Sequence, residues 1–195
     1  MTQMRQLVAQ TRSVRRFLQD RKISMETLME LADLARLCPS AANLQPLRHV
    51  LSCDPGMNEK IFACLGWAAY LKDWPGPGEG ERPAAYIVIM GDSKIANDYL
   101  AHDCGIAAQT ILLAAAEKGL GGCMLGSVNR KKLAAILDAP DDHPILLVIA
   151  LGEPGEKVRI EPLGPDGNIR YRRDENGVHH VPKRALEDVV LRSYP

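Results

Sequence analysis

Three short groups of residues carry side chains that could bind a ligand or support a reaction. The first runs from Thr11 to Phe17, where Arg12, Arg15 and Arg16 accompany Ser13. Guanidinium groups donate paired hydrogen bonds to phosphate oxygens, and a serine hydroxyl with nearby backbone N–H groups can complete the cradle. This group therefore indicates a phosphate site, although its spacing alone is more typical of a solvated basic stretch.

The second group runs from Cys38 to Pro46, where a predicted helix stops and two prolines restrain the chain. It presents Ser40, Asn43 and Gln45 in a short segment. Amide side chains offer both a donor and an acceptor, so they can read the edge of a heterocycle. A capped turn without any ligand is the simpler interpretation of these residues alone.

The third group is the glycine-rich run 119–122, between a predicted helix and a predicted strand. Glycine lets the backbone approach a flat ligand closely, which makes Gly121 and Gly122 candidates for such a contact. The spacing is not G-x-G-x-x-G and the order is helix to strand, so a Rossmann dinucleotide fingerprint is excluded. A helix C-cap explains Gly119 without a ligand.

The other reactive side chains form no recognisable catalytic or metal-binding set. His102 and Asp103 are neighbours in sequence but point to different faces of a predicted helix. His179 and His180 lie in a polar segment with no third ligand in view, which favours a surface role over a metal site. The five cysteines include no C-x-x-C pair, which argues against a zinc site and against a disulfide framework.

The composition excludes several classes of partner. The chain has 195 residues, with 24 Lys and Arg balanced by 24 Asp and Glu, whereas dedicated nucleic-acid binders are usually strongly basic. The longest apolar run, 145–151, is far shorter than the roughly 20 residues that span a bilayer. The first ten residues contain no apolar stretch of signal-peptide length. We therefore expect a cytoplasmic protein that binds neither nucleic acid nor membrane.

The elements that position these groups can be predicted from hydrophobic spacing and from Gly and Pro. Residues 74–83 must form a loop, and the wider segment 67–83 is a candidate cover for a substrate. Residues 152–195 are polar and frequently interrupted by Gly and Pro, which predicts an arm rather than a second core. The chain is then a single domain of residues 1–195. Helices are expected over about 25–38, 56–67, 97–118 and 130–137, and strands over about 47–53, 84–90, 123–125 and 145–151.

In combination, these motifs resemble the FMN-dependent nitroreductase family. The order is R-S-V-R-R-F, then P-S-A-A-N-L-Q-P, then a D-C-G-I-A-A-Q helix that ends in G-L-G-G. The resemblance extends from about Arg12 to the end of the chain. It implies an α+β fold with a central, mostly antiparallel sheet flanked by helices. It also implies a homodimer with FMN at the subunit interface and an exchanged C-terminal arm of about residues 152–195.

The resemblance also implies which residues bind FMN, in four groups along the chain. The first group would hold the phosphate and ribityl chain, and the second would approach the flavin from the partner subunit. The third would place its backbone beside the isoalloxazine ring, and the fourth would add cations near the phosphate. In that order the groups are Arg12, Ser13, Arg15 and Arg16; Ser40, Asn43 and Gln45; Gly121 and Gly122; and Lys183 and Arg184.

The activity that the resemblance implies is a ping-pong transfer of electrons. NAD(P)H would pass hydride to flavin N5 and leave, and a nitroaromatic, quinone or similar acceptor would then take the electrons. Because the flavin carries this chemistry, no catalytic side-chain set is required. Reductive dehalogenation, flavin breakdown and non-catalytic flavin binding remain alternatives. The aromatic residues Trp67, Tyr70 and Trp74 could stack on an aromatic acceptor or simply pack within the protein.

Overall fold

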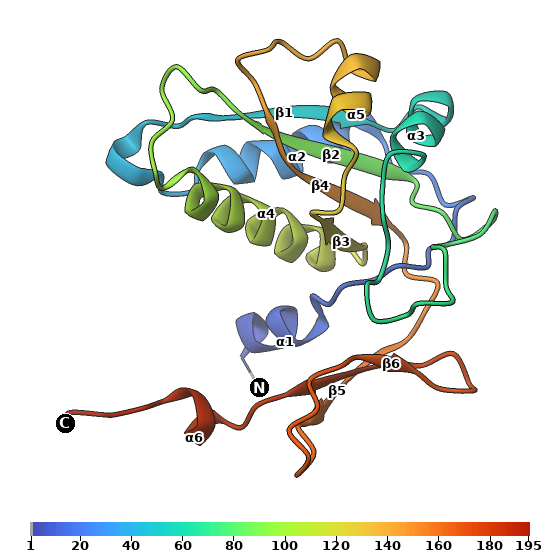
Figure 1. Ribbon diagram of the computed structural model, residues 1–195, viewed down its shortest axis with the longest axis vertical. Helices are drawn as coiled ribbons and strands as arrows, with labels where there is room; N and C mark the ends of the chain where they lie inside the picture. Colours follow the sequence, from blue (N-terminus) through green and yellow to red (C-terminus); the bar gives the residue numbers. More distant parts are fainter. Residues whose placement is uncertain (1) are drawn as a thin grey trace.

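A four-stranded antiparallel sheet forms the centre of the computed structural model, which describes residues 2–195 (Figure 1). Every neighbouring pair of strands runs antiparallel, as predicted. All residues of the second strand in sequence are buried, which explains why this run is continuously apolar. The strand order is β1 (Leu47–Ser52), β2 (Ala85–Gly91), β4 (Ile145–Gly152) and β3 (Gly121–Leu125).

Helices cover both faces of this sheet, which confirms the α+β architecture. Ile87 and Ile89 of β2 belong to one hydrophobic core, whereas Tyr86 and Val88 belong to the other. This division follows from the strand geometry, because successive side chains point to opposite faces. The helices on the first face are α2 (Met25–Arg36) and α4 (Leu100–Glu117), and those on the second are α3 (Pro55–Phe62) and α5 (Arg130–Ile136).

Local capping residues set the helix ends. The Ser24 hydroxyl accepts a hydrogen bond from the Thr27 N–H at 3.1 Å and begins α2. Gly119, with a φ of 75°, ends α4, and the Leu120 N–H donates to the Ala115 carbonyl at 2.9 Å. This is the backbone pattern of a glycine C-cap, so the helix end alone accounts for Gly119.

Two features of the N-terminal half differ from the prediction. Helix α1 (Gln3–Gln10) was not predicted: it has only eight residues, and although Met4, Leu7 and Val8 lie on one face, none of its residues is buried. Helix α3 ends at Phe62 rather than near Trp67. The chain leaves the helix there because it pairs with the segment before α5, where the Gly66 N–H donates to the Ser127 carbonyl at 2.8 Å.

The C-terminal arm contains a small sheet of its own, which the sequence pattern did not predict. Strand β5 (Val158–Pro162) runs parallel to β7 (His179–Lys183), and β6 (Arg172–Arg173) pairs antiparallel with β7. The short helix α6 (Leu186–Val189) and the tail after it extend away from the rest of the molecule (Figure 1). Within residues 2–195, no helix is both long and apolar enough to cross a membrane.

Candidate functional site

A cavity of about 300 Å³ lies where the N-terminal segment, α4, β3 and the arm meet. Four of the predicted phosphate-binding residues line it, namely Arg12, Ser13, Arg15 and Lys183. The structure thus brings cations from both ends of the chain to one place. The rest of the lining comes from Thr11, Gln109, Leu112, Met124, Tyr171, His179 and Val181.

The N-terminal segment reaches this cavity by adding itself to the edge of the main sheet. Ser13 and Gly122 form a parallel bridge, in which the Val14 N–H donates to the Gly122 carbonyl at 2.9 Å. Val14 and Phe17 are both buried in the second core. Backbone pairing and two apolar anchors therefore fix the segment that carries the arginines.

Arg16 does not join the cavity, although it follows Arg15 directly. Side chains alternate along an extended backbone, so the two guanidinium groups diverge. Arg16 lies 3.4 Å from the Glu81 carboxylate and sits over the Trp74 ring instead. Arg184 is exposed and is likewise not among the residues that line the cavity.

A buried carboxylate holds the arginine-rich backbone in place. Glu156 Oε1 accepts hydrogen bonds from the N–H groups of Arg15 at 2.6 Å and Arg16 at 3.3 Å. Its other oxygen pairs with Arg173 Nη2 at 2.7 Å, and the Glu156 side chain is only 2% exposed. Sequence reasoning missed both Glu156 and Arg173, because they lie in the arm and belong to no motif.

The Arg15 guanidinium is buried without a carboxylate partner. Arg15 is 9% exposed, its Nη1 lies 3.2 Å from His179 Nε2, and its Cζ lies 4.8 Å from the Tyr171 ring centroid. Among the described residues, no acidic side chain pairs with this guanidinium, and its Nε has no hydrogen-bond partner. A buried cation is costly unless it is paired. The cavity is therefore suited to an anionic ligand.

His179 is buried at 1% exposure, so the predicted surface role of this residue is wrong. Its ring packs against Tyr171, and its Nε2 accepts from Arg15, which leaves the proton on Nδ1. Burial lowers the pKa of His179 to about 4. The neighbouring His180 instead lies 2.9 Å from both Glu161 and Asp174. No cluster of metal-binding side chains occurs in the part of the chain that the structure describes.

A second cavity of about 320 Å³ adjoins the first, because both are lined by Arg15, Met124 and Tyr171. The segments 66–69 and 123–127 form its other walls, and the chain around 124–127 was not singled out in the sequence. Gly121 and Gly122 line neither cavity. Protein atoms already occupy their surroundings, since a Cβ on Gly122 would lie 2.5 Å from Leu112 Cδ2.

The aromatic residues of the 67–83 segment all contact other side chains of the same chain. Trp67 packs on Phe62 with ring centroids 5.7 Å apart, and Tyr70 packs on Tyr171 at 4.9 Å. Trp74 lies beneath the guanidinium groups of Arg16 and Arg173. These contacts match the alternative in which the aromatic residues pack within the protein. A role of this segment as a substrate cover stays a prediction.

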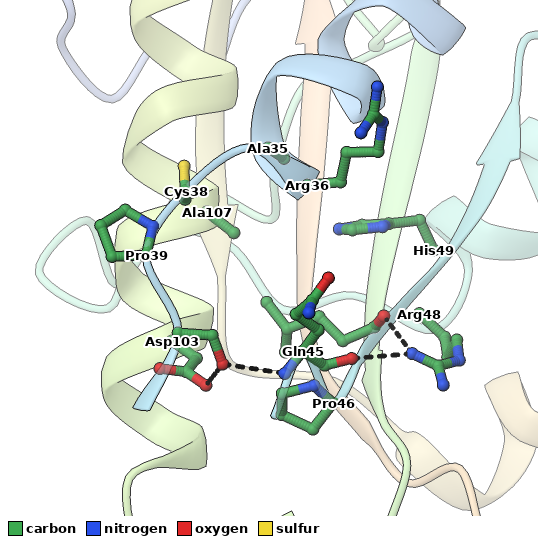
Figure 2. Close-up of a pocket in the computed structure, with 12 residues that line it drawn as sticks. Ala35, Arg36, Cys38, Pro39, Gln45, Pro46, Arg48, His49, Asp103 and Ala107 are labelled. Atoms are coloured by element: carbon green, nitrogen blue, oxygen red, sulfur yellow. Dashed lines mark hydrogen bonds between the residues drawn. The ribbon is translucent and has the colours of Figure 1, made fainter. Parts of the chain in front are cut away.

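The amide-rich segment occupies a separate place beside the start of α4 (Figure 2). Ser40 and Gln45 line a cavity of about 170 Å³ there, which shares no residue with the cationic cavity. The buried Asp103 accepts hydrogen bonds from the Ser40 hydroxyl at 2.7 Å and the Ala41 N–H at 3.1 Å. Sequence reasoning noted Asp103 but missed that it anchors this segment.

The same segment stores backbone strain. Ala42, Asn43 and Gln45 have φ values of 51°, 54° and 52°, a region that residues with a side chain rarely adopt. Figure 2 shows Gln45 beside Asp103, and Arg48 donates to the Gln45 carbonyl at 3.0 Å. Such strain persists only where neighbouring contacts impose it and is frequent in ligand-binding loops.

Comparisons with known proteins agree with this geometry. The Nitroreductase family model matches residues 8–66 and 76–153. A relative from Archaeoglobus fulgidus, named NADH dehydrogenase/NAD(P)H nitroreductase, is 30% identical over 154 residues, which cover 75% of this chain and 83% of the relative. A solved structure from Parabacteroides distasonis with the same name has a TM-score of 0.67 and 25% identity, over 80% of this chain and 90% of that one.

A solved nitroreductase structure from Desulfovibrio desulfuricans, in complex with FMN, covers the whole chain. Its TM-score is 0.69 at 22% identity, and the match covers 100% of this chain and 99% of that chain. At this level of identity the match establishes the shared fold. Because the match covers the whole chain, the C-terminal arm is part of the shared fold.

The two adjacent histidines should affect stability in opposite directions with pH. Burial lowers the pKa of His179 from 6.5 to about 4, whereas hydrogen bonds to Asp174 and Glu161 raise the pKa of His180. Between pH 6.5 and 4 the unfolded chain binds a proton at position 179 that the folded chain does not. His179 therefore lowers the free energy of unfolding by about 1–3 kcal/mol as pH falls. His180 has the opposite effect: its raised pKa means that the folded chain binds the proton more tightly, so its contribution to stability is largest at acid pH.

The measurement is urea unfolding between pH 4.5 and 8, roughly the range over which a histidine titrates, on the wild type, His179→Gln and His180→Gln. The His179→Gln variant should lose less stability on acidification than the wild type, and the His180→Gln variant should lose more. A shift of the same sign in both variants would contradict the assigned environments.

Proposed function

This chain belongs to the nitroreductase family, and on that premise we propose that it is an FMN-dependent oxidoreductase. In this proposal, NAD(P)H is the electron donor and a nitroaromatic, quinone or similar molecule is the acceptor. The observation that carries the proposal is the buried Arg15 guanidinium, which lacks a carboxylate partner among the described residues and faces a cavity shared with Arg12, Ser13 and Lys183. A phosphate monoester would supply the missing negative charge.

The residues present fit the two chemically different ends of FMN. Arg12, Ser13, Arg15 and Lys183 would hold the phosphate, because they supply guanidinium, hydroxyl and ammonium donors around one cavity. The adjoining cavity combines apolar side chains with the backbone of residues 124–127 and would take the ring system. The FMN complex of the Desulfovibrio desulfuricans nitroreductase supports the same choice of cofactor.

The protein's own residues would bind and orient, while the cofactor supplies the redox chemistry. The chemistry that FMN would supply is hydride transfer from NAD(P)H to the acceptor, in a ping-pong sequence. Glu156 holds the backbone of Arg15, so the guanidinium is fixed before any ligand arrives. The neutral His179 accepts from Arg15 and orients it without cancelling its charge. A preorganised cation of this kind costs little further ordering when the anion binds.

We propose further that two copies of the chain complete the site. Ser40, Asn43 and Gln45 lie apart from the cationic cavity within one chain, so a contact between them and the same ligand requires a second copy. The tail after β7 also exposes apolar side chains, with Leu191 93% and Tyr194 83% exposed. Exchange of the arm would bury these groups against the partner.

Sedimentation should give a dimer, and a monomer at micromolar concentration would contradict this arrangement.

Replacing Arg15 should weaken FMN binding far more than replacing its neighbour. Arg15→Gln removes the buried charge that faces the cavity, so we expect a roughly 10–100-fold higher Kd for FMN. Arg16→Gln is the matched control, because the same charge is lost one residue away on the opposite side, and its Kd should stay within about threefold. Quenching of FMN fluorescence measures both constants. Equal effects of the two substitutions would contradict the assignment.

The visible absorption spectrum tests the activity itself. The purified protein should show bound flavin or acquire it on mixing with FMN, and anaerobic NAD(P)H should then bleach the flavin band. A protein that gains no flavin spectrum would overturn the cofactor assignment, whereas flavin that NAD(P)H fails to bleach would indicate a non-catalytic binding protein. Steady-state oxidation of NAD(P)H with nitroaromatic, quinone and haloaromatic acceptors then separates general reduction from dehalogenation.

A further inference from the structure

A cavity of about 400 Å³ lies apart from the proposed flavin site and shares no lining residue with it. Its walls come from Gln19, Asp20 and Lys22, from one side of α3 as far as Phe62, and from the chain between Glu79 and the start of β2. None of the residues proposed to bind FMN lines this cavity. Its polar groups could therefore bind a second ligand.

The first of these groups is the Tyr86 hydroxyl, at the core of the molecule. Tyr86 lines the cavity but is only 1% exposed, because its ring packs in the second core. Its hydroxyl has no hydrogen-bond partner among the residues that the structure describes. Burial raises the pKa of Tyr86, so this hydroxyl keeps its proton and is available as a donor.

The second group is the Arg82 guanidinium, which is held over the Phe62 ring with its Cζ 4.5 Å from the centroid. Arg82 Nε is buried and, within the described chain, has no hydrogen-bond partner. The loop that carries it is fixed, since Gln19 Oε1 accepts from the N–H groups of Gly80 at 2.8 Å and Arg82 at 3.2 Å. The guanidinium is therefore presented by an ordered backbone.

The other buried polar group of this cavity is already satisfied. The Asn58 amide accepts from the Ser52 hydroxyl at 2.7 Å and donates to the Ala84 carbonyl at 2.8 Å. Asn58 thus ties α3 to the sheet. Two unpartnered groups remain in the buried part of the cavity among the described residues, the Tyr86 hydroxyl and Arg82 Nε. The guanidinium N–H can only donate and the phenol hydroxyl can donate, so one acceptor group would satisfy both.

We propose that this cavity binds a small molecule with one carboxylate on a flat apolar body. The carboxylate would accept hydrogen bonds from Tyr86 and Arg82, because the planar guanidinium fork matches a planar carboxylate. The apolar body would lie against Phe62. The charged lining consists of Asp20, Glu59 and Glu79 against Lys22 and Arg82, and this acidic excess repels a doubly charged phosphate more strongly than a single carboxylate.

Occupancy of this cavity can be detected through a tryptophan. Phe62 contacts Arg82 on one side and packs against Trp67 on another, with ring centroids 5.7 Å apart. Trp67 is one of only two tryptophans in the chain and lines the second cavity of the flavin site. A ligand that engages Arg82 should therefore alter the fluorescence of Trp67.

Calorimetric titration of the FMN-saturated protein with benzoate tests the proposal, with tryptophan fluorescence as a second readout. Benzoate should bind the wild type, and both Arg82→Gln and Tyr86→Phe should weaken binding at least about tenfold. Tyr86→Phe keeps the buried ring, so its thermal unfolding should show an intact fold. Arg21→Gln is the matched control, because Arg21 is exposed near the rim but does not line the cavity, and its affinity should stay within about threefold.

Several results would overturn the proposal. Absence of benzoate binding at millimolar concentration would exclude the ligand class. A loss of benzoate binding in Arg15→Gln as large as in Arg82→Gln would place the benzoate in the cationic cavity instead. Tighter, Arg82-dependent binding of inorganic phosphate, or of the neutral analogue benzamide, would show that a single carboxylate is not what the cavity selects.

Discussion

The buried positive charge of Arg15 is the constraint on which the rest of the site depends. A guanidinium that is shielded from water must be compensated, and Glu156, the buried carboxylate that holds the Arg15 backbone, is engaged by backbone N–H groups and by Arg173. His179 offers a hydrogen bond but no negative charge. The fold therefore holds a cation ready for an anion that the described part of the chain does not itself provide.

The architecture around this charge explains why so many separate segments meet there. The antiparallel sheet offers the edge of β3, and the N-terminal segment pairs with that edge through Gly122. The arm begins alongside the N-terminal segment, where Phe17 and Pro154 form an antiparallel bridge, and it contributes Glu156, Tyr171 and His179 to the support of that segment. The main sheet thus acts as a rigid base, and the site is assembled on it from the two ends of the chain.

Sequence reasoning was most successful where the signal is local. The apolar runs of β2 and β4 and the caps at Ser24 and Gly119 depend on a few neighbouring residues, and all lie where the sequence indicated. The sheet of the arm was missed because its strands pair over long separations and β6 has only two residues.

The site residues show the same division between local and long-range information. The motif identified Arg12, Ser13 and Arg15, but only the extended backbone geometry shows that Arg16 points away. The burial of His179 depends on Arg15, which lies far away in the sequence, and so no local pattern could indicate it. The sequence predicted that the backbone at Gly122 lies against a ligand, whereas in the structure the space beside Gly122 is filled by Leu112 and Leu151.

The relative affinity of the protein for FMN and riboflavin tests the central claim most directly, because the two ligands differ only in the phosphate. If the phosphate neutralises the buried Arg15, FMN should bind at least about tenfold more tightly than riboflavin, the difference expected for a charged hydrogen-bonded group. That preference should shrink in Arg15→Gln while riboflavin affinity changes little. Equal affinity for FMN and riboflavin in the wild type would contradict the account.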